Sequence, residues 1–155
     1  MQELELIQDP RITVYGRLFE AWATVTRQLD DQMEREVGIP LTWYGVLLLV
    51  GRSPGGARPI GELGLVTALT SGGVTRLVDR MAAAGYVERA PCPTDRRVIW
   101  VRLTPAGREL LARATEVHLR GIQEYMLDRL APEDVAGLSR LLAKLGPEGA
   151  EPAAE

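Results

Sequence analysis

Apolar residues recur every three or four positions over the first quarter of the chain. The recurrence follows Asp9 and Pro10, which suit the N-cap and the first position of a helix. It predicts one long helix that runs to about Val37, where Gly38 supplies a left-handed stop and Pro40 blocks continuation. The apolar positions of this helix are Ile12, Tyr15, Phe19, Trp22, Val25, Leu29 and Met33.

Three shorter helices are predicted next. Thr42 is placed to cap a very apolar second helix, which ends before a turn rich in proline and glycine. The stretch from Pro59 to Leu69 has helical composition despite two glycines. Thr70 or Ser71 can cap a fourth helix, which Gly85 ends. The fourth helix turns an apolar stripe inward, formed by Val74, Leu77, Val78 and Met81.

Beyond the fourth helix the period of the apolar pattern changes from about 3.6 to about 2 residues. Two short alternating segments flank the turn residues 91–95 and predict a β-hairpin, with Ile99, Val101 and Leu103 on one face. Thr104 and Pro105 then open a long fifth helix to about Leu130. Pro132 begins a last helix, whose apolar side carries Val135, Leu138, Leu141, Leu142 and Leu145.

This order of elements predicts a mainly α-helical fold with a small β-hairpin wing. Short helices followed at once by a hairpin form a winged helix-turn-helix, which we expect over about 40–103. The flanking helices, at about 9–38 and 104–146, are long and amphipathic, so we expect them to mediate dimerisation. The whole chain, 1–155, then forms a single unit, with a disordered tail at 147–155.

Composition and charge change this interpretation in two ways. The 155 residues are 46% hydrophobic and contain one cysteine, Cys92, so the chain can bury a core without an internal disulfide. The net charge is −3, but residues 50–105 contain eight arginines and only four acids. The middle of the chain therefore has four excess positive charges and the remainder seven excess negative charges, which indicates a polyanionic partner for the middle.

Other classes of protein lack their usual sequence features here. No segment approaches the roughly 20 apolar residues of a membrane span, and a secretory signal is absent, so we expect a cytoplasmic protein with no membrane partner. One histidine, one cysteine and no phosphate-binding loop or metal-ligand cluster argue against an enzyme, a metal site or a cofactor. The remaining alternative is a winged helix that binds protein, which would have an uncharged fourth helix and wing.

Three consecutive motifs resemble the MarR family of transcription regulators. They are GGVTRLVDRMAAAGYVER at 72–89, DRR at 95–97 and LTPAGR at 103–108. The likeness extends at pattern level over about Asp9 to Leu145. It departs from the family at Ala68, where a glycine is usual, and at Leu65 and Val66, where charged residues are more common. The resemblance implies a ligand-responsive repressor that binds a pseudo-palindromic site on double-stranded DNA as a homodimer.

The residue chemistry agrees with DNA binding by the fourth helix and the wing. Free N–H groups at a helix N-terminus favour a phosphate, and arginine is the usual partner of guanine in the major groove. An arginine at the hairpin tip can enter the minor groove, a role that the resemblance assigns to Arg96. Asp79 is expected to pair with a neighbouring arginine. The candidate DNA-binding residues are Ser71, Gly72, Gly73, Thr75, Arg76, Arg80, Arg96 and Arg97.

Several of these residues also have plainer interpretations. Gly72 and Gly73 can form a simple turn, Arg76 can be a solvated surface charge, and Asp95 can either pair with an arginine or form the turn. Redox sensing by Cys92 is a further alternative, but the chain contains no second cysteine that could form a disulfide with it.

The resemblance also implies a small aromatic or phenolic effector, bound between the dimer helices and the winged lobe. Its candidate contacts are Tyr15, Trp22, Trp43, Tyr44 and His118, although ordinary packing is the alternative for Trp22 and a satisfied interface position is the alternative for His118. The candidate dimer contacts are Leu138, Leu141, Leu142 and Leu145.

Overall fold

The computed structural model describes residues 6–64, 70–92 and 98–145. It is mainly helical with one small antiparallel sheet, as the sequence predicts. No helix within the described ranges is long and apolar enough to cross a membrane. In chain order the elements, with η for a 3-10 helix, are α2 (Pro10–Val37), α3 (Leu41–Arg52), η1 (Pro54–Gly56), β1 (Ala57–Pro59), η2 (Ile60–Leu63), α5 (Ser71–Ala83), β2 (Val87–Pro91), β3 (Ile99–Leu103), α6 (Pro105–Tyr125), η3 (Leu127–Arg129) and α7 (Pro132–Ala143).

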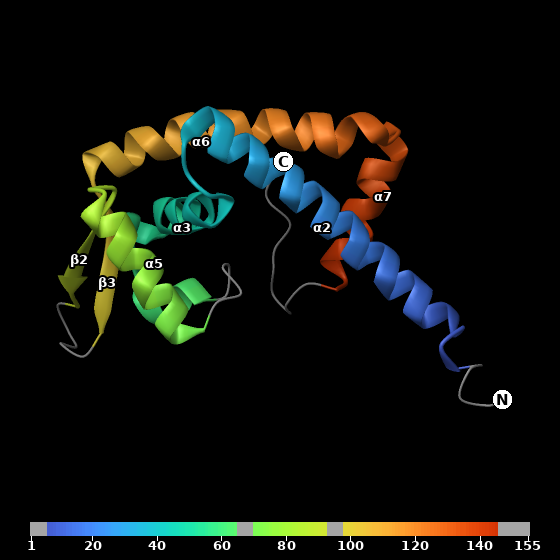
Figure 1. Cartoon of the computed structure of the whole chain (residues 1–155), viewed down its shortest axis with the longest axis horizontal. Helices are drawn as coiled ribbons and strands as arrows, with labels where there is room; N and C mark the ends of the chain where they lie inside the picture. The colour runs from blue at the N-terminus through green and yellow to red at the C-terminus, as the bar shows by residue number, and fades with distance from the viewer. Residues whose placement is uncertain (1–5, 65–69, 93–97, 146–155) are drawn as a thin grey trace.

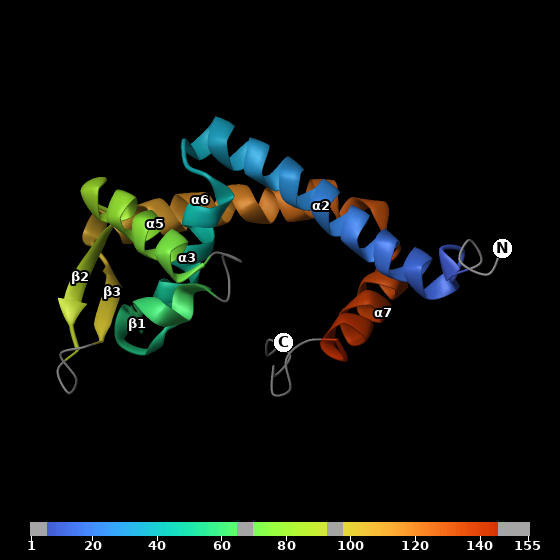
Figure 2. The ribbon, with the colours of Figure 1, turned by 60° about the horizontal axis from the view of Figure 1, so that its bottom comes forward.

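The long helix α6 joins the two ends of the molecule. At its N-terminal end lies a lobe made of α3, α5 and the sheet, and at its C-terminal end lies α7 (Figure 1). Helix α2 crosses α6 and extends away from the lobe, so that its N-terminal part lies near α7 (Figure 2). The lobe therefore meets the other helices mainly along α6 and the C-terminal part of α2.

The ends of most helices are where the sequence predicts them. Asp9 caps α2 by accepting a hydrogen bond of 2.8 Å from the Arg11 N–H, and Thr70 caps α5. Gly38 ends α2 with φ at 81°, and Gly85 follows α5 with φ at 80°, both in the left-handed region that glycine tolerates. Thr104 caps α6 through the Gly107 N–H at 3.0 Å.

The predicted cap of the second helix is wrong. Helix α3 begins at Leu41 and has no cap from the residue that precedes it, Pro40, so Thr42 lies inside the first turn. The Leu41 N–H instead donates to Asp30 Oδ1 at 2.7 Å, from α2. Because this cap comes from another helix, it satisfies the end of α3 and fixes its position against α2 at the same time.

Three other predicted elements differ in the structure. The predicted helix from Pro59 starts one residue later: β1 ends at Pro59, η2 covers Ile60–Leu63 and Gly64 is α-helical, while 65–69 lies outside the described residues. Strand β1 pairs with β3, so the hairpin becomes a three-stranded sheet in the order β1-β3-β2. Helix α6 ends at Tyr125 rather than near Leu130, and η3 leads into α7.

The core of the lobe lies between α3, α5 and the sheet. All four residues of the predicted α5 stripe are buried, and so are Val101 and Leu103 on the inward face of β3. Leu47 and Ala114 join this core from α3 and α6. The core thus continues from the lobe onto α6, which keeps the lobe attached to that helix.

The apolar stripe of α2 is buried over only part of its length. Leu29 and Met33 are buried under α6 and α3. Tyr15 and Trp22 are 70% and 62% exposed, which contradicts ordinary packing of Trp22 within one chain. The N-terminal half of the stripe therefore needs another partner.

Gly107 gives a direct test of how α6 is attached to the lobe. A methyl group at this position would overlap the Tyr86 carbonyl, which is main chain and has little freedom to move. We expect Gly107→Ala to lower the free energy of unfolding by about 3 kcal/mol, the upper end of typical overpacking costs, in urea unfolding at fixed protein concentration.

Gly45→Ala is the matched control, because it also lies inside a helix but has nothing within 4 Å of the added methyl. It should leave stability unchanged or raise it by up to about 1 kcal/mol through helix propensity. Equal effects of the two substitutions would contradict the close approach of α6 to Tyr86.

Candidate nucleic-acid interface

The N-terminus of α5 presents main-chain N–H groups to open space. Thr70 Oγ1 accepts from the Gly73 N–H at 3.3 Å, and the Val74 N–H bonds to the Thr70 carbonyl at 2.9 Å. The N–H groups of Ser71 and Gly72 precede these bonds, and a helix supplies no internal partner for them. Gly72 is exposed, and a side-chain carbon added there would meet nothing within 4 Å. An anion can therefore reach the end of this helix.

The outward face of α5 carries two exposed arginines. Arg76 and Arg80 lie one turn apart and are exposed, and neither forms an ion pair with another described residue. Thr75 is also exposed, beside Arg76. The buried apolar stripe holds α5 against the core. Thr75, Arg76 and Arg80 lie on the opposite, exposed face of the helix.

Asp79, the acid on this face, is paired as the sequence predicts. Its Oδ1 forms an ion pair with Arg89 Nη2 at 2.8 Å, and the same Nη2 donates to the Thr75 carbonyl oxygen at 3.3 Å. Arg89 belongs to β2, so the guanidinium joins the wing sheet to α5. The sequence does not single out Arg89, although the period-two pattern places it on the same strand face as Val87, which is turned toward the core.

The tip of the wing lies outside the described residues. This applies to Asp95, Arg96 and Arg97, and also to Leu65, Val66 and Ala68 and to the tail at 147–155. The strands that hold the tip are described: the Cys92 N–H bonds to the Val98 carbonyl at 2.9 Å, which extends the β2–β3 ladder by one pair. The two strands are thus paired as far as Cys92 and Val98, and Cys92 itself is buried.

Comparison with known proteins identifies this architecture. The model of the MarR family matches residues 37–98. The multiple antibiotic resistance protein MarR of Salmonella typhimurium is 32% identical over 109 residues, which cover 70% of this chain and 74% of that protein. This chain belongs to the MarR family. The HTH-type transcriptional regulator MhqR of Bacillus subtilis is 29% identical over 133 residues, or 84% of this chain and 90% of MhqR.

Solved structures of MarR family members share the whole fold. Sco3205 of Streptomyces coelicolor, determined in complex with DNA, has a TM-score of 0.78 at 29% identity, over 92% of this chain and 91% of that one. A cysteine-to-serine mutant of Escherichia coli MarR with operator DNA has a TM-score of 0.75 at 29% identity, over 88% and 96%. These relatives are transcription regulators and not enzymes, as the sequence predicts for this chain.

The five effector candidates of this MarR family member lie in three places. Tyr15 and Trp22 lie on the exposed half of α2, where they line one surface pocket. The Trp43 ring meets Tyr86, with ring centres 6.2 Å apart. Only Tyr44 and His118 meet each other, with ring centres 4.6 Å apart, where α3 packs on α6.

Three buried polar atoms without partners among the described residues lie on α2 and α6. His118 Nδ1 is buried and has no hydrogen-bond partner within the described part of the chain, and the same holds for the Oε1 atoms of Gln28 and Gln32. All three residues lie on the two helices that cross here, α2 and α6, and Gln32 is also 96% buried. An unpaired buried acceptor costs free energy, so a hydroxyl group of a ligand that donates to it would be stabilised at this crossing.

The four leucines proposed for the dimer lie on α7 and just beyond it. Leu141 and Leu145 are 61% and 71% exposed, Leu142 is exposed and Leu138 is half-buried. Leu145 lines a surface pocket together with Tyr15 and Leu18 of α2. Leu145 and the exposed half of α2 therefore form one continuous apolar surface.

The single histidine allows a clean measurement of its environment. Burial lowers the pKa of His118 below its ordinary value of 6.5, because the imidazolium loses hydration. We expect its imidazole signals, followed by proton–nitrogen NMR on untagged protein, to titrate below 6.5, and those of the urea-unfolded chain to titrate near 6.5.

The sign of the effect on stability follows. As the pH falls from 6.5 through the lowered pKa of the folded state, the unfolded chain binds the proton first, so His118 reduces stability over that interval. Titration of the folded protein at or above 6.5 would show that His118 is not desolvated in this way.

Proposed function

We propose that this chain is a transcription regulator that binds double-stranded DNA through α5 and the wing, as a homodimer. The observation that carries the proposal is the exposed face of α5, where Arg76 and Arg80 have no acidic partner among the described residues and the helix N-terminus is open. The structural relatives solved with DNA support it. The same charges disfavour the alternative of a winged helix that binds protein, which the relatives do not support either.

Each candidate residue then has a distinct role. The N–H groups of Ser71 and Gly72 hold a phosphate, beside Gly73, whose own N–H is bonded to Thr70, and this contact fixes the helix in its groove. Arg76 binds a guanine edge with Thr75 beside it, and Arg80 contacts the backbone. In the wing, Arg96 enters the minor groove and Arg97 contacts phosphate. A cytoplasmic location follows from a DNA partner in a bacterial regulator.

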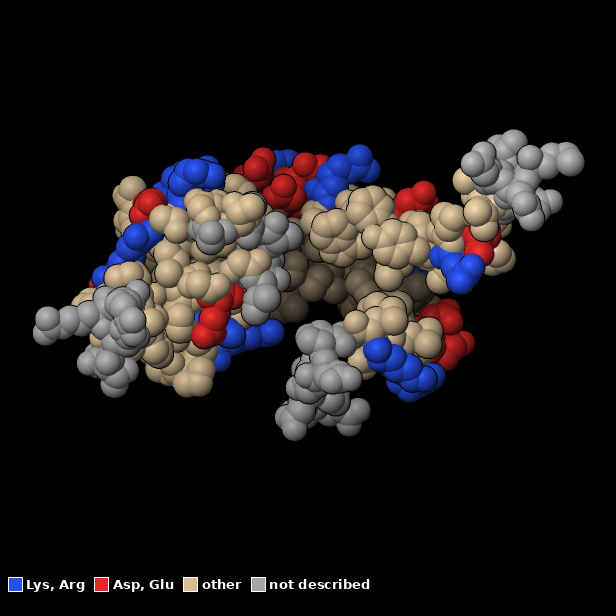
Figure 3. All heavy atoms as spheres, turned by 90° about the horizontal axis from the view of Figure 1, so that it is seen from below, with Lys and Arg blue, Asp and Glu red and all other residues tan. Residues whose placement is uncertain are grey.

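The dimer would be formed by the apolar surface that α2 and α7 share. Figure 3 shows the exposed side of α2 as a strip of uncharged side chains. Isolated apolar side chains on a surface are ordinary, but Tyr15, Trp22 and Leu145 belong to one continuous surface. A twofold partner buries this surface and places two copies of α5 about 34 Å apart, to match successive major grooves of a pseudo-palindrome.

In this proposal the chain divides into a DNA-binding lobe and the helices that form the dimer. The lobe at about 40–103 binds DNA, and the helices at about 9–38 and 104–146 hold the two lobes at a fixed separation. As a repressor, the dimer would occupy its operator until an effector shifts the population toward a separation that no longer fits the DNA.

We place the small aromatic or phenolic effector at the Tyr44–His118 pair. There α3 of the lobe meets α6, and the unpaired atoms of His118 on α6 and of Gln28 and Gln32 on α2 can accept a hydrogen bond from a phenol hydroxyl. The NMR titration of His118 tests this placement. A pKa that stays the same in saturating 4-hydroxybenzoate, together with an unchanged affinity for DNA, would contradict it.

The test of DNA binding is a titration by fluorescence anisotropy against the DNA upstream of the protein's own gene, at several salt concentrations. We expect a steep salt dependence, and at least a tenfold loss of affinity with reduced sequence preference for Arg76→Ala, because one bidentate contact is worth about 1–3 kcal/mol. Arg113→Ala, on the exposed side of α6, is the control and should bind as the unaltered protein does. Salt-insensitive binding, or no effect of Arg76→Ala, would favour a protein partner.

The dimer is tested separately by sedimentation. We expect Leu141→Arg, at one of the exposed candidate dimer leucines of α7, to shift the protein toward monomer, because a buried unpaired charge is costly. Ala136→Arg is the matched control, since it places the same charge on the polar side of α7. A dimer that survives Leu141→Arg and Trp22→Arg together would show that the contact lies elsewhere.

A further inference from the structure

The Asp79–Arg89 pair lies between the two elements that the proposed function assigns to DNA. Arg89 Nη2 lies 2.8 Å from Asp79 Oδ1 and donates to the Thr75 carbonyl oxygen at 3.3 Å. Both acceptors belong to α5, whereas Arg89 belongs to β2 of the wing sheet. The Thr75 carbonyl is main chain and has no rotamers, so this bond attaches the guanidinium to the helix itself.

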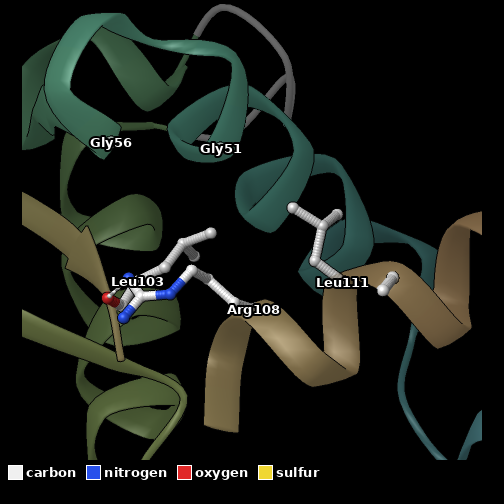
Figure 4. Close-up of a pocket in the computed structure, with 6 residues that line it drawn as sticks. Gly51, Gly56, Leu103, Arg108 and Leu111 are labelled. Atoms are coloured by element: carbon white, nitrogen blue, oxygen red, sulfur yellow. Dashed lines mark hydrogen bonds between the residues drawn. The ribbon is translucent and has the colours of Figure 1, made fainter. Parts of the chain in front are cut away.

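The base of the wing sheet is held by other hydrogen bonds. The Tyr86 N–H, just before β2, donates to the Met81 carbonyl oxygen at 3.0 Å. At the end of β3, the Leu103 carbonyl oxygen accepts from Arg108 Nη1 at 3.0 Å, and Figure 4 shows the Arg108 side chain beside Leu103. The sheet is therefore attached to α5 and α6 at its end farther from the wing tip.

Arg89 attaches β2 to α5 at a second point, closer to the tip. The two carbonyls of α5 that hold β2, those of Met81 and Thr75, are six residues apart, which is about 9 Å along a helix. Strand β2 is at the edge of the sheet order β1-β3-β2, so β3 supports it from one side only. A strand held at one point can pivot, whereas two separated points fix its direction.

Apolar burial decreases along β2 toward the tip. Val87 is 2% exposed, but Arg89, on the same strand face, is exposed, and so is the last residue, Pro91. The side chains of Arg89 and Asp79 are 35% and 57% exposed, so their ion pair adds little to the stability of the fold. The pair therefore acts on the direction of the strand, as well as on the charge that it covers.

From these contacts we propose that Arg89 is a positioning residue for DNA binding, which fixes the angle between the wing and α5. A winged helix meets DNA through its recognition helix and through its wing. Two linked contacts strengthen each other only when the geometry allows both at once. Arg89 acts through the wing and does not itself contact DNA. The role in DNA binding rests on the proposed function, whereas the attachment of β2 to α5 does not.

The first test separates position from charge. Arg89→Met removes the donors and keeps an unbranched side chain, and adding Asp79→Asn restores the net charge without restoring the attachment. We expect this double variant of the full-length protein to bind the DNA upstream of its own gene at least about fivefold more weakly than the unaltered protein. Asp79→Asn alone keeps the bond to Thr75 and should bind at least as tightly. Thermal unfolding of all three proteins should agree within about 5 °C.

A double-mutant cycle shows whether the wing is the element that moves. Arg96→Ala, which changes the wing tip outside the described residues, should weaken binding at least about tenfold in the unaltered protein. In the double variant the same change should cost about twofold or less, because the wing is no longer in place. Arg76→Ala, on α5, should cost the same factor in both backgrounds. A purely structural role of Arg89 would leave both factors unchanged.

The second test needs no DNA. Residual dipolar couplings of main-chain N–H groups, measured by NMR, report the direction of β2 relative to α5. In the unaltered protein the couplings of the two elements should fit one common alignment. In the double variant those of β2 should be reduced by averaging, while those of α5 stay the same.

Three results would overturn the inference. They are full affinity of the double variant, a cost of Arg96→Ala that is equal in both backgrounds while Arg76→Ala keeps its effect, and unchanged couplings of β2 in the double variant. Loss of the Arg76→Ala effect in the unaltered protein is a different outcome. It would contradict the proposed function, and with it any role of Arg89 in DNA binding.

Discussion

The arrangement of the whole molecule depends on the junction at which α6 begins. The Tyr86 carbonyl accepts the Thr104 N–H at 3.1 Å, and the Thr104 hydroxyl lies 2.7 Å from the Gly85 carbonyl and caps Gly107. One side chain thus joins the end of α5, the start of β2 and the start of α6. The absence of a side chain at Gly107 allows this approach. The direction of α5 relative to α6 is therefore fixed by main-chain hydrogen bonds as well as by apolar packing.

The lobe and the flanking helices differ in net charge. The net charge of −3 conceals a lobe with excess arginine and flanking helices with excess acid. Within the lobe, the carboxylate nearest the candidate DNA face, that of Asp79, is paired with Arg89. That ion pair is exposed, so it contributes little to stability. Its larger effect is on the electrostatic potential, because it leaves Arg76 and Arg80 as the charges that α5 presents to a polyanion.

The sequence predicts the features that depend on neighbouring residues and misses those that depend on distant ones. Caps at Asp9, Thr70 and Thr104 are local hydrogen bonds, and the buried stripe of α5 is a local period. The cap of α3 comes from Asp30, eleven residues away on another helix, so Thr42 was the better local candidate. Strand β1 has three residues and exists only through its pairing with β3, more than forty residues later.

The candidate site shows the same limit. The period of α5 separates its exposed arginines from its buried residues, so the sequence predicts which side chains can meet DNA. The effector candidates were chosen by residue type, and type does not determine proximity: only Tyr44 and His118 meet. The α2 stripe was predicted correctly as apolar, but a periodic pattern does not distinguish residues buried within one chain from residues that a second chain must cover.

One half of α2 is buried within its own chain, and the other half carries apolar residues that a second chain would cover. The crossing of α2 and α6 is therefore important for the geometry of a dimer. At the crossing, Gln32 is buried and donates to Glu36 at 2.9 Å, and Glu36 pairs with Arg120 of α6. The Gln32 amide, and then Arg120, hold the pKa of the Glu36 carboxyl below its usual value, so this link persists at neutral pH. One half of α2 is thus fixed to the lobe side of its own chain, while the other half presents the apolar surface. Because the helix is continuous between them, a change in the angle at the crossing must alter the separation of the two lobes in a dimer held by that surface.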